Sequence, residues 1–247
     1  MLSSLRYLLL QVRNPGDTMS GHEVSCFAKH LRCCESNIVV GDLISHPPSR
    51  AELDEVDVVL LGGSGDFSVV TGGPWLESAL DVMRQLHDLS KPTFASCWGF
   101  QAFSLALGGE VITDLNMAEV GTFDLSLTDE GLSDPVFGPM GHQFAAQLGH
   151  QDIVMRLPEG AICLASSERV ANQAFRFEGK PIYGSQFHPE LDLSSLLDRL
   201  RTYPGYIKSI TGLEYETFVR ERCRESMATE SLLERFALEV LRTRNSG

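Results

Sequence analysis

The chain has 247 residues, of which 43% are hydrophobic and 21% charged, and its formal net charge is −13. This composition is ordinary for a globular protein, and the length suits one α/β domain with a C-terminal addition. Because nucleic acids and anionic membranes both attract clustered basic residues, the negative charge argues against either as a partner.

The sequence shows no targeting segment and no metal-binding cysteine pattern. The apolar stretch 5–12 is too short to span a membrane and reads better as a buried first strand. Six cysteines are present without paired CxxC spacing, and we expect most of them to be small buried residues in a reducing cytoplasm.

The N-terminal half alternates between strand-like and helix-like segments. The run Val56–Leu61 is almost entirely apolar and stops at Gly62-Gly63, as expected of a parallel strand covered on both faces. Ser20 is a plausible N-cap for the first helix, and Pro74 suits the first turn of a later one. We predict strands at 5–12, 37–40, 56–61 and 92–96, and helices at 20–32, 74–89 and 98–107. This order predicts an α/β fold with a doubly wound, mostly parallel sheet.

The second half changes character twice. Short alternating segments predict antiparallel strands that extend one edge of the sheet, at 121–127, 161–166, 171–177 and 181–186. After Glu190 the chain turns helical, and residues 231–242 carry an apolar stripe at helical spacing, which we expect to pack back on the same domain. We therefore predict a domain over 1–195 and a C-terminal helical extension over 196–247 packed on it.

The segment Ser96-Cys97-Trp98-Gly99 carries the strongest chemical signal. A predicted strand delivers Cys97 to a tight turn between the small residues Ala95 and Gly99, and a helix starts immediately behind it. This is the context of a nucleophile elbow with cysteine in place of serine. A helix N-terminus also favours the thiolate form of a cysteine, which is the nucleophilic form. A buried structural cysteine at a strand end is the alternative.

A second segment, Phe187-His188-Pro189-Glu190, follows a predicted strand. His188 is a candidate general base for Cys97, and Glu190 is placed to hold the imidazole through its other ring nitrogen. Alone, a surface turn explains the tripeptide equally well.

A third segment, Leu61-Gly62-Gly63-Ser64-Gly65, is a glycine-rich loop after a buried strand. Such loops bind anions on their backbone N–H groups. Phosphate binding is one interpretation, although the Lys and Ser/Thr of a P-loop are missing. The other is an oxyanion hole, with N–H groups supplied by Gly63 and Trp98.

Together and in this order, these segments resemble class I glutamine amidotransferases over about residues 5–195. The match includes the elbow through Gln101, the upstream glycine loop, the downstream His188-Pro189-Glu190, and 150–152 ahead of 157–161. The resemblance implies the family's flavodoxin-like fold. It also implies a Cys97, His188 and Glu190 triad that cleaves a γ-glutamyl amide through a thioester.

The resemblance implies substrate-binding roles as well. Gln101 would help to seat the γ-glutamyl group, and Gln151 would contact the α-amino and carboxylate end of the substrate. No cofactor and no metal are expected. Two positions depart from the family pattern: Ala95 replaces a usual glycine, and Ser64-Gly65 replaces a common Pro-Gly in the oxyanion loop.

Several functions remain open at this stage. The leading hypothesis is a glutaminase that passes ammonia to a separate acceptor enzyme, such as a synthetase subunit, because no synthetase domain or P-loop fits in residues 196–247. A free-standing γ-glutamyl peptidase with the same triad is nearly as well supported. A catalytically silent regulatory module is disfavoured by the intact triad, and a DJ-1-like cysteine hydrolase or chaperone by the downstream His188-Pro189-Glu190.

Overall fold

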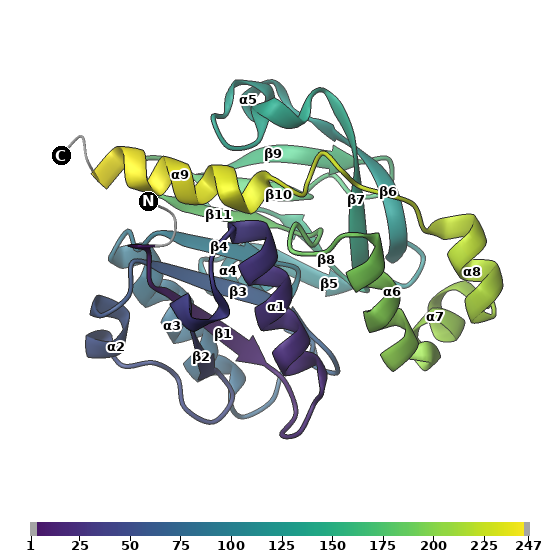
Figure 1. Ribbon diagram of the computed structural model, residues 1–247, viewed down its shortest axis with the longest axis horizontal. Coiled ribbons are helices and arrows are strands. Elements are labelled where there is room, and N and C mark those ends of the chain that lie inside the picture. The colour runs from purple at the N-terminus through teal and green to yellow at the C-terminus, as the bar shows by residue number, and fades with distance from the viewer. Residues whose placement is uncertain (1–3, 245–247) are drawn as a thin grey trace.

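The structure is a computed structural model that describes residues 4–244 (Figure 1). A nine-stranded sheet runs through the molecule in the order β2-β1-β3-β4-β11-β10-β9-β6-β7, and β5 with β8 forms a separate two-stranded sheet. None of the helices within residues 4–244 is long and apolar enough to cross a membrane.

Five neighbouring strands of the large sheet are parallel. They are β2 (Ile38–Asp42), β1 (Tyr7–Val12), β3 (Val58–Ser64), β4 (Thr93–Ser96) and β11 (Ile182–Ser185). Their order corresponds to the 2-1-3-4-5 arrangement of flavodoxin-like sheets, whose ligands bind beyond the carboxyl ends of the strands. This confirms the predicted doubly wound, mostly parallel α/β sheet.

The alternation of side chains along these strands builds a hydrophobic layer on each face. Tyr7 and Leu9 of β1 point to the layer that holds α1 (Met19–Leu31) and α9 (Leu232–Arg244). Leu8 and Leu10 point to the opposite layer, which holds α3 (Leu76–Asp88) and α4 (Trp98–Ala106). A short helix, α2 (Arg50–Asp54), packs at the second layer through Leu53, and the sequence did not predict it.

The other half of the sheet is antiparallel, as predicted, and contains strands the sequence missed. Its strands are β10 (Ala174–Phe177), β9 (Ala161–Ser167), β6 (Glu119–Leu127) and β7 (Gln143–His150), joined by α5 (Asp129–Ser133) and a 3₁₀ turn at Gly138–Met140. The unpredicted strands are β7 and the pair β5 (Glu110–Thr113) and β8 (Asp152–Arg156). β11 was expected to be wholly antiparallel, yet it pairs parallel with β4 and antiparallel with β10, so it joins the two halves.

Three predicted boundaries were wrong. Helix α1 is capped at Thr18 rather than Ser20, and the side chain of Asp17 accepts a hydrogen bond from the N–H of Met19 (2.8 Å). Helix α3 begins at Leu76, two residues after Pro74. Strand β3 continues through the glycines to Ser64, because its pairing with β1 resumes at Ser64 after an irregularity.

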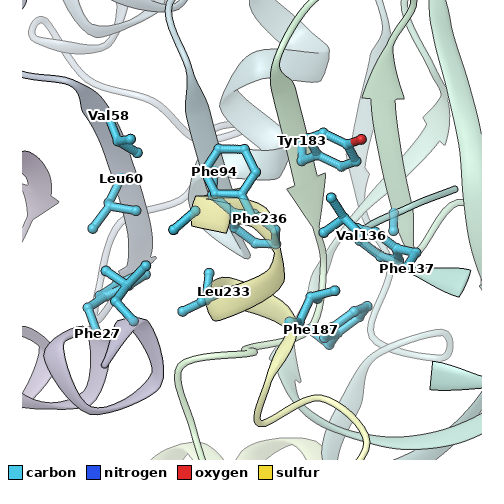
Figure 2. Packing of buried hydrophobic residues seen from close by; sticks show 14 of the residues in the cluster. Phe27, Val58, Leu60, Phe94, Val136, Phe137, Tyr183, Phe187, Leu233 and Phe236 are labelled. Atoms are coloured by element: carbon cyan, nitrogen blue, oxygen red, sulfur yellow. The ribbon is translucent and has the colours of Figure 1, made fainter. Parts of the chain in front are cut away.

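The C-terminal segment divides into two parts (Figure 1). Helices α6 (Leu193–Thr202), α7 (Pro204–Thr211) and α8 (Tyr215–Arg222) share a small hydrophobic cluster of their own beside β6. Helix α9 instead returns across the sheet, where Leu233 and Phe236 insert among Phe94, Tyr183 and Phe187 (Figure 2). The apolar stripe in residues 231–242 is therefore part of the main core.

Candidate active site

A cavity of about 680 Å³ opens at the carboxyl ends of β3 and β4. Its walls come from the end of β3 and the loop behind it (64–68), the start of α4, the end of β7 and the helices α6 and α7. Cys97, Trp98, Gln101, Gln151 and His188 all line it. The cavity therefore brings together segments that are distant in the chain.

Cys97 occupies the strained turn between β4 and α4. Its backbone has φ 50° and ψ −103°, a conformation that non-glycine residues rarely adopt. Such strain costs on the order of 1–3 kcal/mol and persists only where neighbours hold it. Here the N–H of Cys97 donates to the carbonyl of Ser185 (2.8 Å), and the thiol lies 3.8 Å from the carbonyl of Gly149. The geometry is that of a nucleophile elbow.

Gly99 explains how the turn can close. A Cβ atom at Gly99 would lie 2.5 Å from Cβ of Leu61 and 3.2 Å from Cβ of Ala95. Helix α4 therefore packs on β3 and β4 too closely for a side chain at this position. The same contact shows why the departure to Ala95 is tolerated, since its methyl group fits beside the bare Gly99.

His188 follows β11 and lies against the same backbone as Cys97. A Cβ atom built on Gly63 would come within 2.8 Å of Cε1 of His188 and 3.7 Å of Cβ of Cys97. The N–H of His188 donates to the carbonyl of Gln147 (2.9 Å), and Nδ1 lies 2.7 Å from Oε1 of Glu190. Because Nδ1 faces the carboxylate, Nε2 is left to face the thiol.

The pKa values of His188 and Glu190 are both shifted by their mutual contact. Burial opposes the charged imidazolium of His188, but the nearby Glu190 and Cys97, together with the hydrogen bond to Glu190, outweigh burial and raise the pKa of His188 to about 9. Burial likewise opposes the carboxylate of Glu190, yet His188 and then Arg199 lower its pKa to about 2. The arrangement thus favours an imidazolium–carboxylate pair beside the sulfur.

The remaining predicted residues take defined places around the cavity. Gln101 is buried, and its Nε2 donates to the carbonyl of Asp152 (2.9 Å) and to Oε1 of Gln186 (3.1 Å). The Trp98 side chain is almost fully buried, with its ring 5.7 Å from that of Trp75. Gly63 is part of β3 rather than of the loop behind it, and it is not among the residues that line the cavity. Their roles toward a substrate remain predictions.

Sequence reasoning missed Tyr206, which lines the cavity from α7. Burial raises its pKa, and the nearby Cys97 and Asp152 add to that shift, while a side-chain hydrogen bond with Gln151 opposes it. Tyr206 therefore faces both the candidate nucleophile and a predicted substrate contact. No local motif marks it, because only the folding back of α7 brings it there.

A second histidine–carboxylate pair supports the cavity wall. His150 Nε2 lies 3.0 Å from Oε2 of the fully buried Glu119, and Nδ1 lies 3.0 Å from the carbonyl of Asp152. The side chain of Asp152 accepts hydrogen bonds from Ser68 (2.6 Å) and Thr113 (2.5 Å). These bonds fix the segment 150–152, which carries Gln151 between two anchored neighbours. Within residues 4–244, no group of three or more His, Cys, Asp and Glu side chains is arranged to hold a metal ion.

The fold and the site define a class of protein: a doubly wound α/β domain with a cysteine elbow and a neighbouring His–Glu pair. The family model described as "Glutamine amidotransferase class-I" matches residues 28–199. The chain belongs to the class I glutamine amidotransferase family.

The similar proteins agree with this membership. A glutamine-hydrolyzing GMP synthase subunit of Methanothermobacter thermautotrophicus is 31% identical over 144 residues, covering 58% of this chain and 73% of that protein. The subunit of the same name from Sulfolobus acidocaldarius is 34% identical over 148 residues, covering 60% and 74%. A crystal structure of a glutamine amidotransferase from Thermotoga maritima has a TM-score of 0.75 at 19% identity, covering 96% of this chain and 98% of that one, so it supports the fold.

Proposed function

We propose that this protein hydrolyses the γ-carboxamide of glutamine through Cys97, His188 and Glu190, and releases ammonia for a separate acceptor enzyme. The single observation that carries the proposal is the packing of Cys97 and His188 against the same glycine, with Glu190 2.7 Å behind the imidazole. Three segments distant in sequence meet there: one carries Gly63, one carries Cys97, and one carries both His188 and Glu190.

The chemistry runs in two halves. The Cys97 thiolate attacks the γ-carbonyl carbon, and the carbonyl electrons move to oxygen, which the N–H groups of Gly63 and Trp98 stabilise. As the tetrahedral intermediate collapses, the C–N bond breaks and the His188 imidazolium gives its proton to the leaving nitrogen, producing ammonia and a γ-glutamyl thioester. Water then attacks the thioester while His188 takes its proton, and glutamate leaves with Cys97 restored.

Glu190 and two glutamines support these steps. Glu190 holds the His188 ring so that Nε2 faces the sulfur and stabilises its positive charge. Gln101 helps to seat the γ-glutamyl group, and Gln151 binds the α-amino and carboxylate end. Both side chains line the cavity, which supports these assignments.

The acceptor belongs to another chain in this proposal. Residues 193–244 form α6, α7, α8 and α9, and α9 supplies part of the main core, so this segment belongs to the amidotransferase fold itself. The relatives from Methanothermobacter thermautotrophicus and Sulfolobus acidocaldarius are each named as a subunit of GMP synthase, which supports an arrangement in which the amidotransferase is a chain of its own. All six cysteines are free, which suits a reducing compartment such as the cytoplasm.

A second candidate function is supported by the size of the cavity. Its volume of about 680 Å³ lies well inside the range of roughly 300–1,000 Å³ that is typical of drug-sized ligands. Glutamine is much smaller than such ligands. A γ-glutamyl peptidase would use the remaining space between Cys97 and the side chains of Tyr203 and Tyr206 to hold an amine larger than ammonia.

The test compares the two substrates in the isolated protein. Ammonia release from glutamine and cleavage of γ-glutamyl dipeptides are measured for wild type and for Cys97→Ala. Hydrolysis of glutamine, alone or after a synthetase partner is added, supports the amidotransferase, and activity on dipeptides alone supports the peptidase. Either activity should fall by about 10⁴-fold or more in Cys97→Ala. Retention of activity in that variant contradicts both proposals.

A further inference from the structure

Helix α6 places one arginine between two buried carboxylates. Nη2 of Arg199 lies 3.4 Å from Oε1 of Glu190 and 3.6 Å from Oε1 of Glu23, and neither carboxylate side chain is exposed. Nη1 of the same guanidinium is 3.4 Å from Nδ1 of His188. Arg199 therefore touches both the histidine and the glutamate of the candidate triad.

Glu23, on helix α1, is held from the other side. Nε and Nη2 of Arg13 donate to its two oxygens, each at 3.1 Å, and Nε2 of Gln11 donates to Oε2 at 2.9 Å. Its carboxylate is thus fixed by groups from β1 and the loop behind it. The result is an alternating series of charges that runs from Arg13 through Glu23 and Arg199 to Glu190.

Glu23 also lies against the glycine-rich end of β3. A Cβ atom on Gly62 would come within 2.1 Å of Oε1 of Glu23. The next residue, Gly63, is the backbone against which His188 and Cys97 pack. The carboxylate of Glu23 therefore lies against Gly62 of β3, next to the predicted oxyanion donor Gly63. It also contacts Arg199, which in turn contacts Glu190 and His188.

We propose that Arg199 and Glu23 are positioning residues for the triad: Arg199 holds Glu190 and orients His188, and Glu23 holds Arg199 while supporting the Gly62-Gly63 backbone. This inference rests on the proposed function in taking Cys97 as the nucleophile. Neither residue belongs to a motif that the sequence marked, and they lie on α6 and α1, outside the segments that carry the triad.

The alternating charges predict opposite electrostatic effects on Cys97 and His188 when Arg199 or Glu23 is neutralised. Removing the positive charge of Arg199 leaves the surroundings of Cys97 and His188 more negative, which favours the protonated thiol and the imidazolium. Removing the negative charge of Glu23 acts in the opposite direction. Other ionisable groups face this region as well, and they stay unchanged in the test: His22 and Cys26 from α1, Asp17 and Asp66 from the loops behind β1 and β3, His150 at the end of β7, Asp152 at the start of β8, and Tyr203 and Tyr206 at α7.

The experiment follows alkylation of Cys97 by iodoacetamide against pH in the full-length protein, with the modified peptide identified by mass. Arg199→Met should move the midpoint of the alkylation profile to higher pH by roughly one unit or more, and Glu23→Gln should move it to lower pH. The double variant should return close to wild type. Arg199→Lys, which keeps the charge, should also stay close to wild type.

Glutamine turnover gives the second readout. A single ammonium group cannot reach both His188 and the two carboxylates as Nη1 and Nη2 of the guanidinium do. Arg199→Lys should therefore keep the alkylation midpoint but lower kcat between about ten- and a hundredfold, with little change in KM. Arg201→Met is the matched control, since Arg201 is an exposed arginine on the same helix paired with Asp198. It should leave both readouts unchanged.

The outcomes separate this inference from the proposed function. Midpoints of Arg199→Met and Glu23→Gln equal to that of wild type overturn it, and so does full kcat in Arg199→Lys. If Arg199→Met does not fold, as judged by circular dichroism, the midpoint of Glu23→Gln and the kcat of Arg199→Lys decide instead. Alkylation needs no substrate, so opposite midpoint shifts in a protein inactive on glutamine would sustain the positioning role and reject the glutaminase proposal.

Discussion

The carboxylate of Glu190 meets the imidazole of His188 at 2.7 Å, and both side chains are almost completely removed from water. A charged pair in such a place is stable only while both partners remain. The pair leaves Nε2 to face Cys97 and favours the imidazolium form of His188, which in the proposed reaction gives its proton to the leaving nitrogen.

This pairing predicts the alkaline limb of activity. The pKa of His188 is raised to about 9, so the imidazolium persists below that pH and is lost as pH rises through it. We expect kcat/KM for glutamine to fall above about pH 9. In Glu190→Gln the main cause of the upward shift is gone while burial remains, so the limb should move down by at least about one unit. A pH–rate profile measures this shift, with Glu159→Gln, a change at an exposed glutamate, as the control. An alkaline limb at the wild-type pH in Glu190→Gln would show that Glu190 does not raise the pKa of His188.

Tyr206 should affect binding rather than chemistry. Tyr206→Phe removes the hydroxyl that lies near the side chain of Gln151 and leaves the ring on the cavity wall. We expect this hydroxyl to help bind the substrate together with Gln151, and the loss of one hydrogen bond, worth about 0.5–1.5 kcal/mol, should raise KM roughly 2- to 12-fold with kcat nearly unchanged.

Tyr215→Phe is the matched control for this experiment. The hydroxyl of Tyr215 is buried and has no hydrogen-bond partner among residues 4–244, so its loss should leave KM at the wild-type value. Equal KM values for Tyr206→Phe and wild type would reject the role given to the Tyr206–Gln151 contact.

Gly99 should be intolerant of any side chain. Gly99→Ala places a methyl group 2.5 Å from Cβ of Leu61, so α4 must move off β3 and the elbow must shift with it. Such overpacking costs about 1–3 kcal/mol of unfolding free energy and should also lower glutamine turnover. Gly21→Ala, in helix α1 with nothing within 4 Å of the new Cβ, should be neutral or stabilising by up to about 1 kcal/mol. Equal denaturation midpoints for the two variants would contradict the packing described for α4.

Helix α9 should be essential to the stability of the core. Phe236 is 1% exposed, and its ring lies 5.4 Å from that of Phe94 and 5.7 Å from that of Tyr183 (Figure 2). Phe236→Ala should therefore lower the free energy of unfolding by about 3–5 kcal/mol in urea or thermal denaturation. Leu238→Ala, on the exposed side of the same helix, should change it little. A small effect of Phe236→Ala would mean that α9 is only loosely attached.

The strands and the elbow were predictable because their signals are local. The apolar run Val56–Leu61 needs burial on both faces, and the small residues around Cys97 permit only a tight turn. The glycines after Leu61 and the turn at Cys97 therefore both fall at the carboxyl end of one parallel sheet, and they are two of the three segments that form the candidate site. Strand β7 was missed because its eight residues mix Gly149 and Gln147 with apolar positions and show no clear alternation.

The supporting residues could not be predicted in the same way. Glu23 lies in an ordinary helical segment, and its burial against Gly62 appears only when α1 packs on the sheet. Arg199 and Tyr206 reach the cavity because α6 and α7 fold back over it, and sequence periodicity gives the helices but not their direction. Tertiary packing, rather than any motif, creates these contacts.

The most direct measurement of the central claim is covalent labelling of the native protein by a γ-glutamyl electrophile, such as a diazoketone analogue of glutamine, followed by peptide mapping. The reagent should modify Cys97 stoichiometrically, glutamine should protect it, and His188→Asn should abolish the reaction. Labelling of the exposed Cys34 instead, or labelling of Cys97 that is indifferent to both glutamine and His188, would contradict the proposed catalytic site.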